Sequence, residues 1–332
     1  MKTQLNFAII GIGRFGKNYL KTLSGIKEAS VRWVCSSNHN TLNEALPDFN
    51  SNYQIKKTTN FKKILDDKDV DAVIISTPGS THYRIAKGCL NAGKHVLVEK
   101  PFCLKSKEAK DLLKVSKNKK KICAVGHLHM FNPGIEKLRK DIKSGIFGKI
   151  NYISITHLGN GPVRSDISAL WDFLPHSVSI FLHLLETNPI QISINGASFL
   201  RKGVEDIVAM EMKFPNNIFA ASFCSWLHPQ KKMEVVVAGE KIYSVFDDYA
   251  QDKLKYFDSV PKLVNGKIII DDKGSRTVSI SDAKPLTSQI NHFIDCIKNS
   301  KTPINDAENG FVVTSILEIG QKSMKQSKQL KI

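Results

Sequence analysis

The stretch LNFAIIGIGRFGKNYLKTLSGI, residues 5–26, decides the fold of the first half of the chain. Its apolar start is typical of a buried β-strand, and KNYLKTLSGI has the spacing of an amphipathic helix. In the GxGxxG pattern between them, the first glycine permits a tight turn, the second admits a pyrophosphate close to the backbone, and the third lets helix and strand pack. The stretch therefore predicts a dinucleotide site, with an ordinary strand-to-helix turn as the alternative. The residues predicted to contact the dinucleotide are Gly11, Gly13, Arg14, Phe15 and Gly16.

The alternation of strand and helix continues to about residue 125. The runs follow one another as SVRWVC, DAVIIST, THYRIAKGCLNAG, HVLVEKP, SKEAKDLLKVSKN and KICAVGH. Strands that alternate with helices form a parallel sheet whose faces are covered by the helices. We therefore expect residues 1–125 to form a Rossmann domain that binds NAD or NADP.

Beyond this point the strands follow one another without intervening helices. After a helix-like segment, PGIEKLRKDIKSG, come KINYISITHL, IQISINGASFL, VAMEMKF, IFAASFCSW and MEVVVAG. Such strands pair antiparallel, and the PNN sequence between the third and fourth is typical of a hairpin turn. The helix that begins near Trp171 and the helix at 286–300 are expected to cover this sheet. Residues 126–332 are thus predicted to be an α+β domain, whose last helix, at 307–327, belongs to it or packs back on the first domain.

Composition bounds the class of protein. The 332 residues suffice for two domains with their own cores, and 42% of them are hydrophobic. The formal net charge is +17, but the basic residues are 41 lysines and only seven arginines. Scattered lysine solvates a surface, whereas recognition of bases and phosphates favours clustered arginine. We therefore expect no nucleic-acid partner.

The cysteines and the apolar runs bear on location. The six cysteines stand singly without CxxC spacing, so we expect buried free thiols and neither a redox couple nor a metal site. The apolar stretch before the first glycine is shorter than a signal-peptide core, and no later run approaches a membrane span. The expectation is a cytoplasmic protein without membrane contact.

Residues that follow the parallel strands are candidates for ligand contacts, because ligands of open α/β sheets bind beyond the carboxyl ends of the strands. After the second strand, Ser36 and Ser37 stand where an acidic residue normally selects the ribose of NAD. With no adjacent arginine either, the choice between NAD and NADP stays open. After VLV come Glu99 and Lys100, and the bond to Pro101 could be cis. A surface salt bridge is the alternative interpretation of the pair.

The stretch WDFLPHSVSIFLHLLE, residues 171–186, begins a buried helix with two polar side chains. If the helix starts near Trp171, Asp172 and His176 share one face, and Pro175 falls in the first turn, where a missing N–H is harmless. Asp172 as an N-cap and His176 as a buried structural histidine are the alternative. Beside a dinucleotide turn and a strand-end lysine, a catalytic pair is favoured, since histidine suits proton abstraction from a hydroxyl.

Together these features resemble the Gfo/Idh/MocA oxidoreductases, a family named for glucose-fructose oxidoreductase, inositol dehydrogenase and rhizopine catabolism. The resemblance runs along nearly the whole chain through GIGRFGKN, STPGSTHYRIAKGCLNAGKHVLVEKP, GHLHMFNPGIEKL, SGIFGKI, LWDFLPHSVSIFLHLL, HFIDCI and ENGFVVTSILEIGQKS. The order of glycine turn, EKP and a later DxxxH is highly specific. The resemblance implies a Rossmann domain for the cofactor and a second domain with an open, mainly antiparallel sheet. It also implies a homo-oligomer, either a dimer or a tetramer.

The resemblance further implies roles for single residues. Lys100 would bind and polarise the reacting hydroxyl, His176 would be the acid/base, and Asp172 would orient the substrate or the catalyst. The further cofactor contacts that it implies are Thr77, Pro78, His82 and Glu99. The implied substrate contacts are Lys100, Asn132, Arg164, Asp172 and His176.

Within the family, GKN, the NP at 132–133, GPVRSDISALWD and VAGEKIYSVFDDY look most like members that act on nucleotide-linked sugars in surface-polysaccharide or amino-sugar pathways. The reaction would oxidise a sugar hydroxyl, at C3 of a UDP-amino sugar, or run in reverse. Arg164 is the candidate for a substrate phosphate or carboxylate, with a surface loop arginine as the alternative. Met130 and Gly79 depart from commoner family patterns and leave the substrate less defined. A non-catalytic, NAD(P)-binding regulatory or scaffolding protein is the alternative function.

Overall fold

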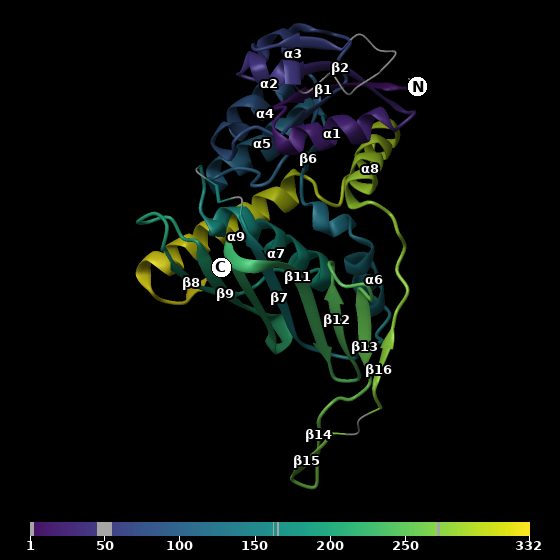
Figure 1. The fold of residues 1–332 in the computed structure, drawn as a ribbon, viewed down its shortest axis with the longest axis vertical. Coiled ribbons are helices and arrows are strands. Elements are labelled where there is room, and N and C mark those ends of the chain that lie inside the picture. Colours follow the sequence, from purple (N-terminus) through teal and green to yellow (C-terminus); the bar gives the residue numbers. More distant parts are fainter. Residues whose placement is uncertain (1–2, 45–54, 162, 165, 271–272) are drawn as a thin grey trace. The chain divides into compact units, whose positions relative to one another are not determined.

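The computed structural model divides the chain into two compact units (Figure 1). The residues that it describes are 3–44, 55–161, 163–164, 166–270 and 273–332. The first unit comprises Met1–Leu128 and Lys284–Ser315, and the second comprises His129–Ala283 and Ile316–Ile332. The last helix, α9 (Ala307–Gln326), therefore contributes residues to both units.

The first unit is built on a six-stranded parallel sheet in the order β3-β2-β1-β4-β5-β6. Its strands are β1 (Leu5–Ile10), β2 (Ala29–Cys35), β3 (Lys56–Thr58), β4 (Ala72–Ile75), β5 (His95–Val98) and β6 (Cys123–Val125). Parallel strands are covered on both faces and need apolar residues throughout. All four residues of β4 are accordingly buried. The predicted Rossmann sheet is confirmed.

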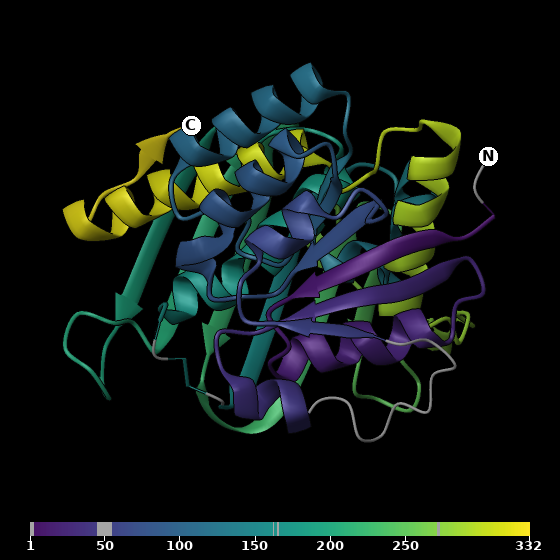
Figure 2. The ribbon, with the colours of Figure 1, turned by 90° about the horizontal axis from the view of Figure 1, so that it is seen from above.

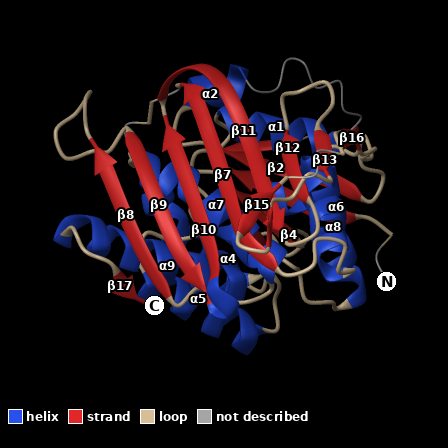
Figure 3. Cartoon of the chain, turned by 90° about the horizontal axis from the view of Figure 1, so that it is seen from below, coloured by secondary structure: helices blue, strands red, loops and turns tan. Residues whose placement is uncertain are grey.

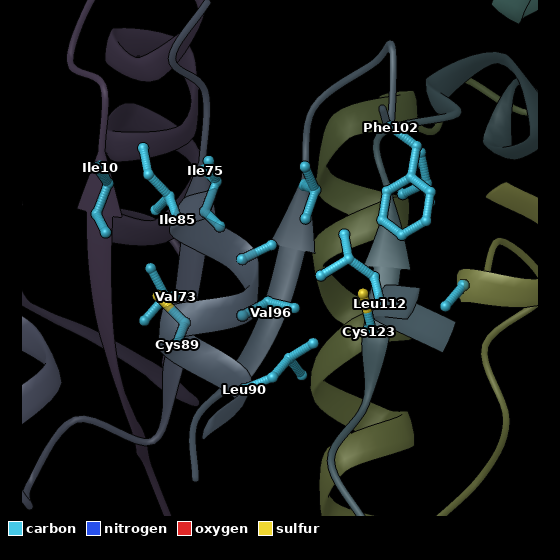
Figure 4. Packing of buried hydrophobic residues seen from close by; sticks show 14 of the residues in the cluster. Ile10, Val73, Ile75, Ile85, Cys89, Leu90, Val96, Phe102, Leu112 and Cys123 are labelled. Carbon is cyan, nitrogen blue, oxygen red and sulfur yellow. The ribbon is translucent and has the colours of Figure 1, made fainter. Parts of the chain in front are cut away.

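Helices cover both faces of this sheet. Ala8 and Ile10 of β1 belong to a core that includes residues of α4 (His82–Asn91) and α5 (Ser106–Lys119), and Figure 4 shows part of it. Phe7 and Ile9 point the other way, into a core that includes α1 (Arg14–Ser24). Figure 2 shows α1 on one face of the strands and α4 and α5 on the other. Two short helices, α2 (His39–Glu44) and α3 (Lys62–Asp66), lie between β2 and β4 in the sequence.

The helix α8 (Pro285–Asn299) belongs to this first unit, so the prediction that it covers the second sheet is wrong. Ile290, Phe293 and Ile294 pack in the same core as Phe7, and the Phe7 and Phe293 ring centroids are 6.3 Å apart. An amphipathic stripe shows that one helix face is buried, but it does not show against which sheet. A helix from the far end of the chain, α8, therefore helps α1 to cover this face of the parallel sheet.

The second unit contains a nine-stranded sheet in the order β16-β13-β12-β11-β7-β10-β9-β8-β17, seen face-on in Figure 3. Its strands are β7 (Ile150–Asn160), β8 (Gln191–Ala197), β9 (Ile207–Phe214), β10 (Ile218–Ser225), β11 (Leu227–Gly239), β12 (Tyr243–Asp247), β13 (Leu254–Phe257), β16 (Ser275–Thr277) and β17 (Leu330–Lys331). Only β7 and β10 pair parallel among the described strands of this sheet. The mainly antiparallel sheet is confirmed, and so is the turn at Pro215–Asn217 between β9 and β10.

The helices α6 (Pro133–Lys143) and α7 (Ala169–Leu185) also belong to the second unit, together with a separate hairpin of β14 (Lys262–Val264) and β15 (Lys267–Ile269). The helix α7 begins two residues earlier than predicted, with Ser168 at its N-cap. Pro175 therefore lies inside the helix and not in its first turn, and Asp172 is not the N-cap. The physical reason is that Ala169 and Leu170 are apolar, buried residues, so the chain enters the helix with them.

The six cysteines are buried free thiols, as predicted. Burial raises the pKa of the Cys35 thiol to about 11 and that of Cys89 to about 12. These thiols are therefore protonated and unreactive near neutral pH. Within the described ranges, no helix has the length and apolarity that a bilayer span requires.

Candidate functional site

The glycine turn between β1 and α1 excludes side chains at two of its three glycines. Gly11 has φ of +94°, and a Cβ there would lie 2.6 Å from the carbonyl carbon of Ser76. A Cβ on Gly16 would lie 2.0 Å from the carbonyl oxygen of Gly11. At Gly13, by contrast, no atom of the described chain lies within 4 Å of a Cβ. Backbone packing therefore explains Gly11 and Gly16, whereas the space at Gly13 is open to a ligand.

That open space adjoins the N-terminus of α1. Gly13 is the N-cap of the helix, and no side chain from the described residues caps it by a hydrogen bond. The first turn contains Arg14 and Phe15 and no acidic residue. Uncapped amides and the positive end of the helix dipole attract an anion. The turn therefore fits the pyrophosphate of a dinucleotide.

The two glycines provide a matched pair of substitutions. We expect Gly13→Ala to fold with the thermal stability of the wild type, because its Cβ meets no protein atom, and to weaken binding of NADH or NADPH about tenfold or more because the methyl occupies ligand space. Gly16→Ala should instead destabilise the fold by about 3 kcal/mol, because its Cβ meets backbone. Thermal unfolding and a fluorescence titration with each reduced cofactor measure both effects. Unchanged cofactor affinity in Gly13→Ala would place the ligand elsewhere.

The other first-unit residues predicted to contact the cofactor follow β2, β4 and β5 at the carboxyl edge of the sheet. They are Ser36, Ser37, Thr77, Pro78, Glu99 and Lys100. His82 connects two of these loops, since its Nδ1 lies 2.8 Å from the Pro101 carbonyl oxygen and its Nε2 lies 2.8 Å from that of Thr77. The buried His82 ring thus holds the loops after β4 and β5 together.

Glu99 points into the first unit and organises the backbone of its neighbour. Its Oε1 accepts a hydrogen bond of 2.6 Å from the Tyr19 hydroxyl, and its Oε2 accepts one of 3.0 Å from the Lys100 amide. Burial, then the nearby Glu99, raises the pKa of Tyr19, so the hydroxyl remains a donor. A Cβ on Gly126 would lie 2.8 Å from Oε1, which leaves no room for a side chain there. Glu99 therefore fixes the main chain from which the Lys100 side chain departs.

Lys100 leaves the end of β5 beside the end of β6. Val98 pairs with Val125, and the Gly126 amide donates a hydrogen bond of 2.7 Å to the Val98 carbonyl. Lys100 and His127 each lie two residues beyond this pair, in the loops that follow β5 and β6. The Lys100–Pro101 bond is cis, as its sequence allowed.

In the second unit, Asp172 and His176 lie one turn apart on α7. The Asp172 carboxylate accepts a hydrogen bond of 3.1 Å from the indole N–H of Trp226. The His176 ring is 8% exposed and stands edge-on to His129, with centroids 4.6 Å apart. The His157 ring centroid lies 5.9 Å from that of His176. The second unit thus gathers three imidazoles beside an anchored carboxylate.

Sequence reasoning missed His129 and His157. His129 lies in the 3₁₀ turn Leu128–Phe131. His157 lies in β7, where its ring is tilted by 50° against that of Phe173 with centroids 4.5 Å apart. The available signal was weak, because a histidine in a loop or a strand has no periodic partner in the sequence. Over the ranges that the structure describes, no group of three or more His, Cys, Asp or Glu side chains is arranged to hold a metal ion.

Two predicted substrate contacts already have partners within the second unit. Asn132 is the N-cap of α6, and its Oδ1 accepts a hydrogen bond of 2.9 Å from the Gly134 amide. Arg164 donates two hydrogen bonds to Asp166, of 3.0 Å and 2.9 Å. Its carbonyl oxygen also accepts a hydrogen bond from Arg201. Asp166 thus engages the Nε and Nη2 groups of the Arg164 guanidinium, which has five N–H donors in all.

A cavity of about 300 Å³ lies at the opposite edge of the first sheet. It is bordered by His95 and Cys123, at the starts of β5 and β6, and by the C-terminal ends of α5 and α8. Two of its lysines, Lys117 and Lys301, are paired with carboxylates, and helix C-terminal carbonyls disfavour an anion. The cavity contains none of the predicted site residues and is separate from the candidate site.

Two models of one protein family match the chain. The model described as "Oxidoreductase family, NAD-binding Rossmann fold" matches residues 5–127. The model described as "GFO/IDH/MocA C-terminal domain" matches residues 135–243. The two matches together extend over more than two thirds of the chain.

Individual proteins show the same likeness. UDP-N-acetylglucosamine 3-dehydrogenase of Acidithiobacillus ferrooxidans is 34% identical over 131 residues, which are 39% of this chain and 41% of that protein. The chain thus matches about two fifths of that relative's length. An NAD(+)-dependent scyllo-inositol 2-dehydrogenase of Bacillus subtilis is 26% identical over 328 residues, 92% of this chain and 89% of that protein. The solved structure of the Acidithiobacillus enzyme shares the fold, with a TM-score of 0.84 and 22% identity over 98% of this chain and 99% of that one.

Proposed function

Because the chain belongs to the Gfo/Idh/MocA oxidoreductase family, we propose that it is an NAD- or NADP-dependent dehydrogenase acting on a sugar hydroxyl, or on the corresponding ketone in reverse. The observation that carries this proposal is the carboxyl edge of the first sheet. There the open Gly13 turn follows β1 and Lys100 follows β5. The turn can hold the pyrophosphate of the cofactor, and the ammonium lies at the edge of the sheet where ligands of this fold bind.

In the proposed mechanism, the protein's side chains handle the proton and the charge. The cofactor, when bound, supplies the hydride acceptor or donor. The His176 imidazole takes the proton of the sugar hydroxyl as the carbon–oxygen bond becomes a carbonyl. The Lys100 ammonium stabilises the negative charge that develops on the oxygen. Asp172, held by Trp226, orients the sugar or the imidazole.

For the substrate we propose a nucleotide-linked sugar, oxidised at C3 of a UDP-amino sugar, in surface-polysaccharide or amino-sugar biosynthesis. The 34% identity over 131 residues to a UDP-N-acetylglucosamine 3-dehydrogenase supports this class. A polyol is the alternative substrate, because the scyllo-inositol 2-dehydrogenase is 26% identical over 328 residues. Arg164 is the proposed ligand of the diphosphate, and Asp166 holds its guanidinium through Nε and Nη2. We also propose that the protein works in the cytoplasm as a homo-oligomer.

The proposed function is tested by following the absorbance of the reduced nicotinamide over a panel of sugars with both cofactors. The panel contains UDP-N-acetylglucosamine, UDP-glucose, free N-acetylglucosamine, myo-inositol and scyllo-inositol. Turnover of UDP-N-acetylglucosamine well above that of the free sugar is expected, because the diphosphate adds binding energy at Arg164. Turnover of polyols alone would retain the dehydrogenase and refute the nucleotide-sugar assignment. Tight cofactor binding without turnover of any sugar would favour the non-catalytic alternative.

A further inference from the structure

The His127 imidazole, at the end of β6, is wholly buried and has one fixed partner. Its Nδ1 lies 2.7 Å from the Oδ1 atom of Asn309. Asn309 is held in the first turn of α9, where its main-chain N–H donates a hydrogen bond of 2.8 Å to the Asp306 carboxylate. An amide oxygen only accepts, so Nδ1 of His127 carries the hydrogen.

The other ring nitrogen of His127 is a lone-pair acceptor. Burial lowers the pKa of His127 to about 4, and the charge of Lys100 acts in the same direction against the opposing hydrogen bond from Asn309. A neutral imidazole protonated on Nδ1 presents its lone pair at Nε2. Among the residues that the structure describes, Nε2 is buried and has no hydrogen-bond partner. A buried acceptor without a donor is unfavourable, so a donor that reaches it is held firmly.

Lys100 is the donor whose position suits this nitrogen. It follows the paired end of β5 by two residues, as His127 follows the end of β6. The loops are adjacent there, because a Cβ on Gly126 would lie 3.1 Å from the Cα of Glu99. The flexible four-carbon stem of Lys100 can direct its ammonium to a neighbouring acceptor. The Nε2 atom of His127 is buried, so water does not reach it from solvent. An ammonium on a neutral acceptor also forms a charge-assisted hydrogen bond. The Lys100 side chain is therefore the candidate donor for this nitrogen.

We propose that His127 is a positioning residue for Lys100: Nε2 accepts a hydrogen bond from the ammonium and directs its remaining N–H groups toward the sugar oxygen. Asn309 takes part indirectly, because it selects the tautomer in which Nε2 is the acceptor. The inference depends on the proposed role of Lys100 in sugar oxidation. It goes beyond that role by naming the two side chains that aim the ammonium.

The kinetic test compares two substitutions at His127 in the full-length protein with cofactor. His127→Phe should lower kcat about ten- to a hundredfold, the effect of losing one hydrogen bond to a charged group, while the KM for the sugar and the Kd for the cofactor stay near wild type. His127→Gln should recover much of kcat, because a glutamine amide oxygen can accept the same hydrogen bond. A parallel change of kcat, KM and Kd, or no recovery with Gln, would indicate a merely structural residue and overturn the proposal.

His95 supplies the matched control. It is a half-buried imidazole at the start of β5, its Nδ1 accepts a hydrogen bond of 3.1 Å from the Ile122 amide, and burial lowers its pKa to about 4. His95→Phe should lower thermal stability and leave kcat unchanged. If His95→Phe reduced kcat as much as His127→Phe does, the effect at His127 would be one of packing.

Nitrogen NMR of the His127 ring gives a readout that does not depend on turnover. In the wild type the Nε2 resonance should have the shift of a hydrogen-bonded acceptor, and in Lys100→Met it should move to that of an unbonded one. Identical spectra would overturn the proposal. Retained turnover in Lys100→Met would instead remove Lys100 from the chemistry and leave the dehydrogenase assignment standing. Loss of turnover there with full kcat in His127→Phe would refute only the role of His127.

Discussion

Lys100→Met is expected to lower kcat by about 10³-fold, the effect of removing a charged donor from a developing oxyanion. Methionine has a similar length but neither charge nor N–H group, so the negative oxygen of the transition state loses its stabilisation. The backbone at this position is held by Glu99, whose bond to the Lys100 amide does not need the side chain. Steady-state kinetics should therefore show the loss in kcat, and a fluorescence titration should show nearly unchanged cofactor affinity.

The control for this prediction is the same substitution at the opposite end of β5. Lys94 precedes the strand, is 4% exposed, and donates a hydrogen bond of 2.6 Å to the Asp67 carbonyl. Lys94→Met should lower thermal stability, because that carbonyl loses its donor, and should leave kcat within about twofold of wild type. Turnover in Lys100→Met close to that of the wild type would remove Lys100 from the chemistry.

His176→Asn is expected to lower kcat by about 10²- to 10⁴-fold, the range for loss of a general base. Asparagine preserves polarity and much of the shape, but its amide cannot take up a proton near neutral pH. The surroundings of the ring should persist, because His129 and Asp172 are placed by the main chain and by Trp226. The loss should appear in kcat with the sugar in excess, and cofactor affinity should not change.

His183, two turns further along α7, is the matched control for His176. Its ring is buried and its Nε2 contacts the carboxylate of Glu136 on α6. His183→Asn should lower the free energy of unfolding through loss of this buried contact and leave kcat unaffected. An equal loss of kcat in both variants would show that His176 supports the helix and not the reaction.

Much of the first unit could be predicted because its signals are local. The strand, the glycine turn and the helix of residues 5–26 follow from apolar spacing and from the GxGxxG pattern. The demand for glycine at position 16 is local, because a Cβ there would meet the Gly11 carbonyl. Lys100 could be placed at a strand end by the same means. The start of α7 was predicted two residues late, since Ser168 makes no side-chain cap and the boundary has no clear signal.

The candidate site was predicted less completely than the fold. Asp172 and His176 could be identified because a helix places residues four apart on one face. His127, His129 and His157 were not predicted as site residues. Each contacts a side chain that is distant in the sequence, and no local pattern indicates such a contact. Asn132 was implied by the resemblance and Arg164 was chosen for its guanidinium. The structure shows that Gly134 and Asp166 already engage these two side chains.

For this protein, the sequence was sufficient to predict the features whose signals lie within one helical turn or one strand. These are the alternation of strands and helices, the dinucleotide turn and the face of α7 that carries DxxxH. Tertiary structure alone decided that α8 packs on the first sheet and that the His127 ring contacts Asn309 of α9. The physical reason is that hydrophobic burial is non-directional and specifies no partner. Partners separated by 150 residues or more are selected only when the whole chain packs.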